Sequence, residues 1–93
     1  MEGVTFDNVF DAPADTAAAA ANMKLRAELL SALRTRVGSW RLPQQEAAGR
    51  LGITRPRLND MMRGKLGKFS LDALVNLSAA AGLSLQISIA EAG

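Results

Sequence analysis

The chain has 93 residues, of which 48% are apolar and 22% are charged, proportions that indicate one small globular domain. The absence of cysteine excludes disulfides and thiolate metal sites, and without histidine or tyrosine only carboxylates and lysines remain for acid–base catalysis. Given this small set of catalytic groups, we expect a protein that is not an enzyme and needs no cofactor. No apolar run is long enough to predict a membrane span, and the acidic N-terminus is unlike a signal peptide, so we expect a cytoplasmic location.

The net charge of +2 conceals an uneven distribution of charge along the chain. Residues 24–68 hold all 11 Lys and Arg together with three acidic side chains, whereas residues 1–23 hold four acidic side chains and no basic one, and residues 69–93 hold two acidic ones. A basic centre between acidic ends indicates a surface for a polyanion. Composition alone supports equally well the alternative that these cations only solvate helices.

Residues 1–14 show weak periodicity, and we expect an N-terminal arm there. Asp7, Asp11 and Asp15 follow one another at intervals of four, a spacing that would place three carboxylates on one helix face, as a metal site requires. The favoured interpretation is that they precede a helix start, where acidic side chains suit the helix dipole. We therefore predict no metal site.

From Asp15 to about Val37 the sequence is rich in residues that favour helices, with Asp15 or Thr16 as the N-cap. Gly38 and Ser39 are expected to end this helix. Its predicted apolar face comprises Met23, Ala27, Leu29, Leu30, Leu33 and Val37. We interpret Trp40, which follows, as a core side chain at the helix junction, the alternative being a surface on which a ligand stacks.

Two short helices are predicted next, from about Pro43 to Leu51 and from Arg55 to about Arg63, joined by a three-residue turn. Gly52 suits a left-handed end of the first helix, and Thr54 suits the N-cap of the second. Pro56 then falls in the first turn of the second helix, where backbone N–H groups have no partner within the helix, so it breaks nothing. This arrangement predicts a helix-turn-helix motif.

The last predicted elements are a helix over Leu71–Ala81, capped by Ser70, and a strand over residues 83–89. The strand follows from strict alternation, which puts Leu83, Leu85, Ile87 and Ile89 on one face. A lone strand leaves its backbone groups unpaired, and we favour pairing with the same strand of a second copy, which makes this segment the dimerisation surface. The alternative partner is the N-terminal stretch "VTFDNVF".

The segment from Leu42 to Gly64 resembles the helix-turn-helix domains of phage lambda repressor and Cro, because it aligns without a gap with their opening pattern L-[ST]-Q-x-x-x-A-x-x-[LM]-G-[IV]. Pro43 departs from that pattern, since it stands where the class has a capping Ser or Thr. Over about residues 20–90 the chain also resembles small XRE-type antitoxins of the HigA kind, through "GITRPRLNDMMRGK", "FSLDALVNLSAAAGL" and the terminal strand.

The resemblance implies an all-α, lambda repressor-like bundle of four to five helices with one C-terminal β-strand. Residues 1–14 would form the arm, residues 15–82 the DNA-binding domain, and residues 83–93 the dimerisation strand and tail.

In such a motif the second helix enters the major groove, and arginine suits guanine whereas asparagine suits adenine. The expected base contacts are Arg55, Arg57, Asn59 and Asp60. For Asp60 we favour an alternative role, that of holding Arg57 or Arg63 in position along the helix. The expected contacts to the DNA backbone are Gln44, Gln45, Thr54, Arg63, Lys65 and Lys68.

We therefore expect a transcriptional regulator that binds an inverted-repeat operator in double-stranded DNA as a homodimer. The favoured role is an antitoxin that neutralises a RelE/HigB-like toxin and represses its own operon, because a chain of 93 residues has no room for a ligand-sensing domain. The alternatives are a free-standing phage-type repressor and, more distantly, an RNA-binding protein. RNA binding is disfavoured because no aromatic side chain lies on the basic helix.

Overall fold

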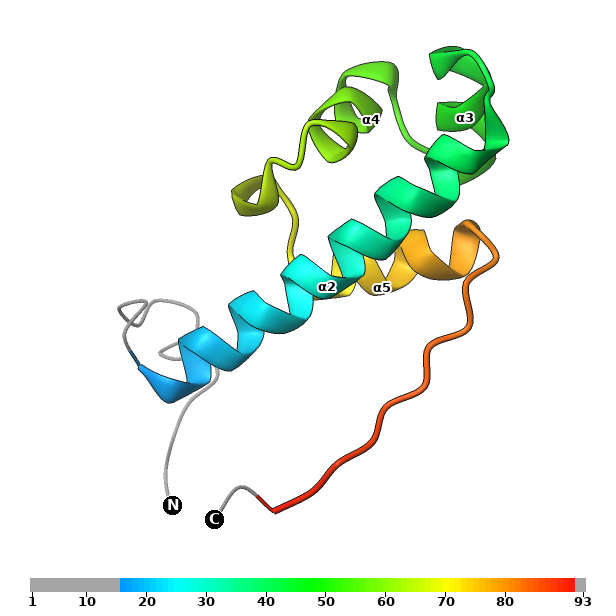
Figure 1. The fold of residues 1–93 in the computed structure, drawn as a ribbon. Helices are drawn as coiled ribbons and strands as arrows, with labels where there is room; N and C mark the ends of the chain where they lie inside the picture. The colour runs from blue at the N-terminus through cyan, green and yellow to red at the C-terminus, as the bar shows by residue number, and fades with distance from the viewer. Residues whose placement is uncertain (1–15, 92–93) are drawn as a thin grey trace.

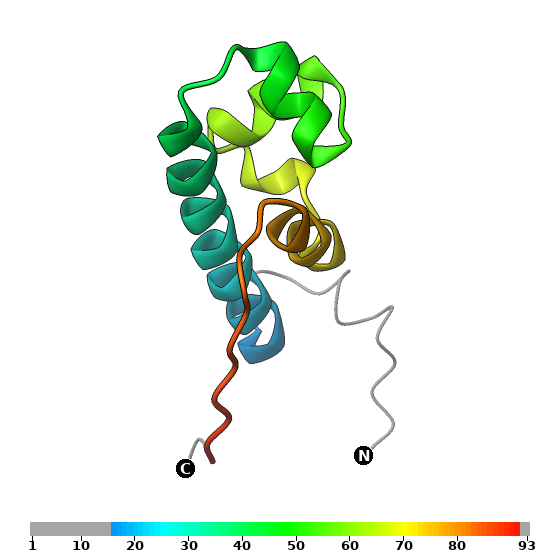
Figure 2. The ribbon, with the colours of Figure 1, turned by 90° about the vertical axis from the view of Figure 1, so that its right-hand side faces the viewer.

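The computed structural model describes residues 16–91, and this range folds into four α-helices and one short 3₁₀-helix (Figure 1). Their bounds are Ala17–Trp40 for α2, Gln44–Leu51 for α3, Arg55–Met62 for α4, Leu66–Lys68 for η1 and Leu71–Ala80 for α5. Helix α5 packs alongside α2, while α3 and α4 pack against each other at the C-terminal half of α2 (Figures 1 and 2). The described range thus has the expected all-α architecture. The predicted arm and the three N-terminal aspartates lie outside it.

The core forms where α2, α4 and α5 meet. Leu33, Leu58, Met61, Phe69 and Leu74 are almost fully buried there. On α2 the predicted apolar face is buried only from Leu29 onward, and the predicted core positions Met23 and Ala27 are exposed. In this part of α2, Arg26 meets η1 and Leu25 lines a groove with α5, so Met23 and Ala27 lie on a side of the helix that no described element covers. None of the described helices is both long and apolar enough to span a membrane.

The first helix does not end at Gly38 and Ser39 as predicted, but continues to Trp40. Arg41 ends it with φ 54°, a left-handed conformation that is uncommon for a residue with a side chain. Trp40 packs against the core, as interpreted from the sequence, and the guanidinium of Arg50 lies 4.8 Å from its ring centre. Because α2 continues to Trp40, Gly38 lies within the helix, where a glycine costs roughly 1 kcal/mol. The packing of Trp40 against the core offsets this cost.

Hydroxyl side chains cap three of the helices, as predicted. The Oγ1 of Thr16 accepts the N–H of Ala19, and the Oγ of Ser70 accepts the N–H of Ala73, both at 3.1 Å. Helix α3 starts after Pro43 and has no side-chain cap. It therefore lacks a contribution of about 1 kcal/mol that Ser or Thr would provide at this position.

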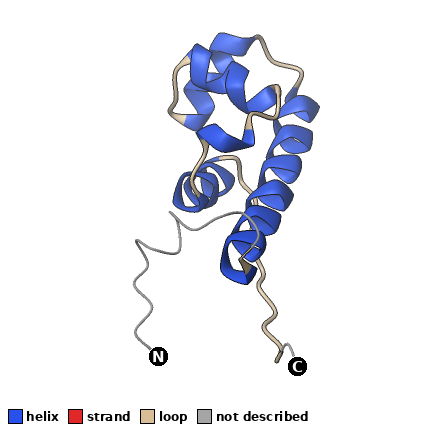
Figure 3. Cartoon of the chain, turned by 90° about the vertical axis from the view of Figure 1, so that its left-hand side faces the viewer, coloured by secondary structure: helices blue, strands red, loops and turns tan. Residues whose placement is uncertain are grey.

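Residues 83–91 are extended, and no part of the described chain forms a β-strand (Figure 3). Leu83, the first of the predicted dimerisation residues, packs against the core of its own chain, and its N–H donates to the carbonyl of Ser78. Beyond it, Ile87 and Ile89 are 73% and 90% exposed. The alternating apolar residues therefore form no β-ladder within residues 16–91. A strand needs a second strand for its backbone hydrogen bonds, and none lies beside this segment in the described range. The strand and its dimer stay predictions, and the alternative partner lies outside the described residues.

Two glycines, one within α3 and one directly after it, form a matched pair that tests the left-handed end of this helix. Gly52 has φ 72° and Gly49 lies within the helix, and a Cβ added at either position would meet no atom within 4 Å. Both positions thus have room for a methyl group, and they differ in backbone conformation, which is left-handed only at Gly52. We expect Gly52→Ala to lower the free energy of unfolding by about 1–2 kcal/mol and Gly49→Ala to raise it by roughly 0.5–1 kcal/mol. Denaturant titration measures both, and equal effects would contradict the left-handed turn.

Candidate nucleic-acid interface

The motif predicted from the sequence is formed by α3, the turn at residues 52–54, and α4. The N–H of Ile53 donates to the carbonyl of Ala48 at 3.0 Å, which closes the turn behind Gly52. Thr54 then caps α4, because its Oγ1 accepts the N–H of Arg57 at 3.3 Å. Pro56 is the second residue of α4, where it removes no helical hydrogen bond. The local structure of the predicted helix-turn-helix is thereby confirmed.

The starts of α3 and α4 meet around an open depression. Its lining residues are Gln44, Arg55, Pro56 and Asn59. Gln44 and Arg55 are the first residues of their helices and are exposed, and Asn59 is half-buried. Residues four apart lie on the same side of a helix, so Arg63 continues the row of Arg55 and Asn59. The predicted base contacts Arg55 and Asn59 are brought together with Gln44, as expected.

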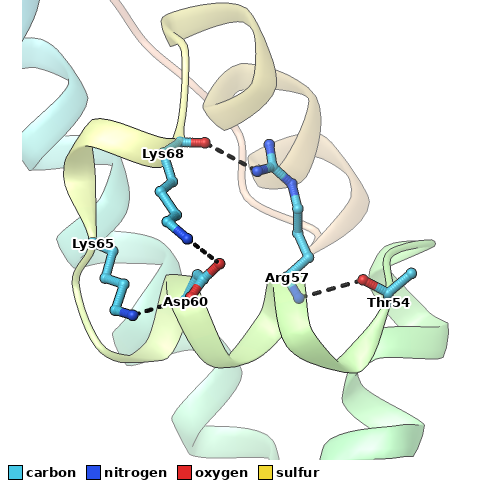
Figure 4. A network of polar contacts seen from close by, with 5 residues as sticks. All are labelled: Thr54, Arg57, Asp60, Lys65 and Lys68. Carbon is cyan, nitrogen blue, oxygen red and sulfur yellow. Dashed lines mark hydrogen bonds and ion pairs between the residues drawn. The ribbon is translucent and has the colours of Figure 1, made fainter.

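Arg57 points to the other side of α4 (Figure 4). Its guanidinium donates a hydrogen bond of 3.0 Å to the carbonyl of Lys68 and lies 4.3 Å from the ring centre of Phe69. Arg57 is half-buried, unlike Arg55. The structure therefore separates the two arginines that the sequence assigned together to base contacts.

Asp60 lies between two lysines of the loop that follows α4 (Figure 4). Its carboxylate oxygens are 3.5 Å from the Nζ of Lys65 and 3.6 Å from the Nζ of Lys68. The favoured interpretation, that Asp60 holds Arg57 or Arg63, is therefore wrong, because the ion-pair partners of Asp60 are lysines of the loop. The chain turns back after α4 and brings the ammonium groups of both loop lysines next to the carboxylate of Asp60. Exposed ion pairs of this kind contribute only about 0.2–1 kcal/mol, so their main effect is on side-chain position.

Three arginines of α2 hold the ends of the elements that follow it. The guanidinium of Arg26 donates to the carbonyls of Leu66 and Phe69 at 3.3 and 3.2 Å. Arg34 donates to the carbonyl of Met62, the last residue of α4, at 2.9 Å. A Cβ at Gly64, which has φ 73°, would lie 3.4 Å from the same guanidinium.

Arg36 makes the third such contact, a 2.9 Å hydrogen bond to the carbonyl of Ala81 just beyond α5. Cationic donors suit helix C-termini, where backbone carbonyls have no helical partner. Sequence reasoning missed these roles, because nothing in the local pattern shows which distant carbonyl an arginine will meet. Part of the basic centre is thus structural.

The predicted backbone contacts lie on both sides of α4. Gln44 and Gln45 begin α3, whereas Arg63, Lys65 and Lys68 follow α4, and all five are exposed. Thr54 is exposed as well and is used as the N-cap of α4. The arrangement therefore surrounds the outer face of α4 with hydrogen-bond donors and cations, which suits an elongated polyanion.

Residues 12–90 match the profile of a protein family described as a helix-turn-helix domain. A search among functionally curated proteins found no match. The matched range contains all the helices described above, including α3 and α4.

Proposed function

The chain belongs to this helix-turn-helix family, and we propose that it is a sequence-specific, DNA-binding transcriptional regulator whose helix α4 enters the major groove. The observation that carries the proposal is the open row of Arg55 and Asn59 beside Gln44 at the start of both helices. Within residues 16–91, neither Arg55 nor Asn59 has a hydrogen bond or ion pair from its side chain to the protein. Both are therefore available to a ligand.

The chemistry of this row suits DNA. The first residues of a recognition helix meet base edges, where arginine binds guanine with two hydrogen bonds and asparagine binds adenine. We propose that Gln44, the first residue of α3, contacts a phosphate beside them. The role that we propose is binding without catalysis, in the cytoplasm.

We propose further that the regulator is a homodimer on an inverted repeat, with half-sites about one helical turn, ~34 Å, apart. The support is the exposed apolar row of Leu85, Ile87 and Ile89 on an extended segment without a backbone partner in the described range. The same segment borders an apolar groove to which α2 contributes Leu25 and α5 contributes Val75. A second copy that pairs with this segment would satisfy the backbone N–H and C=O groups along one of its edges.

The more specific role we propose is that of an XRE-type antitoxin of the HigA kind, which binds a RelE/HigB-like toxin. Support comes from the resemblance and from the charge beside the groove. Glu28 lines the groove, and Asp72 in the first turn of α5 and Glu91 are exposed. An acidic, apolar surface away from α4 suits a basic protein partner. A free-standing repressor is the alternative, and an RNA-binding protein is a more distant one.

The base-reading role is tested with Arg55→Ala and, as a matched control, Lys65→Ala. We expect Arg55→Ala to relax the preference at one base pair by about 1–3 kcal/mol, because a bidentate contact to a base is lost. Lys65→Ala removes a phosphate contact and should weaken binding to all sequences alike. Competition binding between the preferred duplex and its single-base-pair variants measures both. Equal binding of the unmodified chain to every duplex would contradict sequence recognition.

The dimer is tested with Ile87→Asp and, as a control, Ser88→Asp on the opposite face of the extended segment. A buried carboxylate at the proposed interface has no partner, so Ile87→Asp should convert dimers into monomers, whereas Ser88→Asp should not. Sedimentation equilibrium measures the mass of each. A monomeric unmodified chain, or equal effects of the two substitutions, would exclude this interface.

The antitoxin role is tested by co-expression with the product of the adjacent small reading frame. We expect the two proteins to copurify and the chain to relieve growth arrest. Glu28→Lys should weaken this capture because it reverses a charge at the groove, whereas Glu46→Lys on α3 should not. Failure of both copurification and protection would leave the free-standing repressor.

A further inference from the structure

We propose that the flank of α4 formed by Arg57 and Asp60 reads no base and instead controls how the following loop binds DNA phosphates. Arg57 fixes the loop, and Asp60 competes with phosphates for Lys65 and Lys68. The inference rests on the proposed function, because it assumes that α4 binds duplex DNA. It divides the outer surface of α4 into a reading row, Arg55 and Asn59, and a controlling flank.

The case for Arg57 rests on its two contacts and on where they lead. The Nη1 of the guanidinium donates to the carbonyl of Lys68, and its Cζ lies 4.3 Å from the ring centre of Phe69. That ring is 1% exposed, so Arg57 links the loop directly to a fixed part of the core. To reach a base edge, Arg57 would have to give up both contacts, whereas Arg55 would give up none within the described residues.

The loop is held from its other side as well. Arg26 of α2 donates to the carbonyls of Leu66 and Phe69, which enclose η1. Arg57 thus completes a clamp in which the loop backbone is hydrogen-bonded by one arginine from α2 and one from α4. Because the loop backbone is fixed, its lysines stay at a constant distance from α4. This distance determines which phosphates they can contact when α4 binds DNA.

The case for Asp60 rests on charge. Its single carboxylate lies within 3.6 Å of both loop ammonium groups, and these lysines are 42% and 58% exposed. Any phosphate that approaches the loop must share these cations with Asp60 and is repelled by its negative charge. Lys68 is bound at both ends, by Arg57 through its carbonyl and by Asp60 through its ammonium group. For Asp60 to accept a hydrogen bond from cytosine, its carboxylate would have to be shared between the base and these two lysines.

The test uses the full chain and a duplex that the unmodified protein selects from a random library. Affinity is measured for that duplex, for its single-base-pair variants and for an unrelated duplex, each over a range of salt concentrations. Arg57→Ala should weaken binding to all of them by one common factor and lower the salt slope by about one, because an ordered lysine contact is lost. Arg57→Lys should not restore binding, since an ammonium group lacks the planar face and the fork of donors.

Asp60→Asn should act in the opposite direction. It removes the competing charge at nearly constant shape, so affinity for every duplex should rise by about two- to fivefold with the base preference unchanged. If Arg57→Ala does not fold, as judged by circular dichroism, Arg57→Lys and Asp60→Asn carry the test.

The inference is overturned if an Arg57 or Asp60 variant loses preference at one base pair by tenfold or more, or if lysine replaces Arg57 without loss. Either result leaves the proposed function intact. By contrast, an unmodified chain that selects no sequence from the library refutes the proposed function and the inference with it.

Discussion

The burial of Phe69 is the constraint on which the candidate interface depends. Its ring is held in the core with Leu33, Leu58 and Leu74, and Arg57 covers it from the side of α4. A single aromatic side chain therefore joins the hydrophobic core, α4 and the loop that follows α4. Because protein interiors are closely packed, a shift of this ring would displace α4 and the loop together.

The arginines of this small domain perform two different tasks. Those on α2 donate to carbonyls at the ends of later elements, where their positive charge is used within the protein. Arg55 and Arg63, on the row that faces away from the core, keep their side chains exposed. The total number of cations thus overstates the charge offered to a polyanion, and the position of each guanidinium decides its role.

Local signals made most of the fold predictable from the sequence. Thr16, Thr54 and Ser70 cap helices because a hydroxyl beside an apolar run is a strong start signal, and Gly52 adopts the left-handed turn that it was expected to adopt. The failures involve distant partners. The end of α2 depends on where Trp40 packs, and the partners of Asp60 and Arg57 depend on a loop that returns from Gly64, a positive-φ residue. The spacing of residues along one helix predicts neither the end of α2 nor the partners of these two side chains.

The size of α4 bears on the number of copies that a specific complex needs. Within its eight residues, α4 itself places Arg55 and Asn59 on the reading row beside Gln44, and Arg63 follows directly after the helix. Each bidentate contact discriminates by about 1–3 kcal/mol, so the two proposed base contacts of one copy would supply ~2–6 kcal/mol. Specific regulators prefer their sites by roughly 4–10 kcal/mol over other DNA. One copy reaches at best the lower part of that range, whereas two copies on an inverted repeat cover it, and the extended apolar segment after α5 is the part of the described chain best suited to join them.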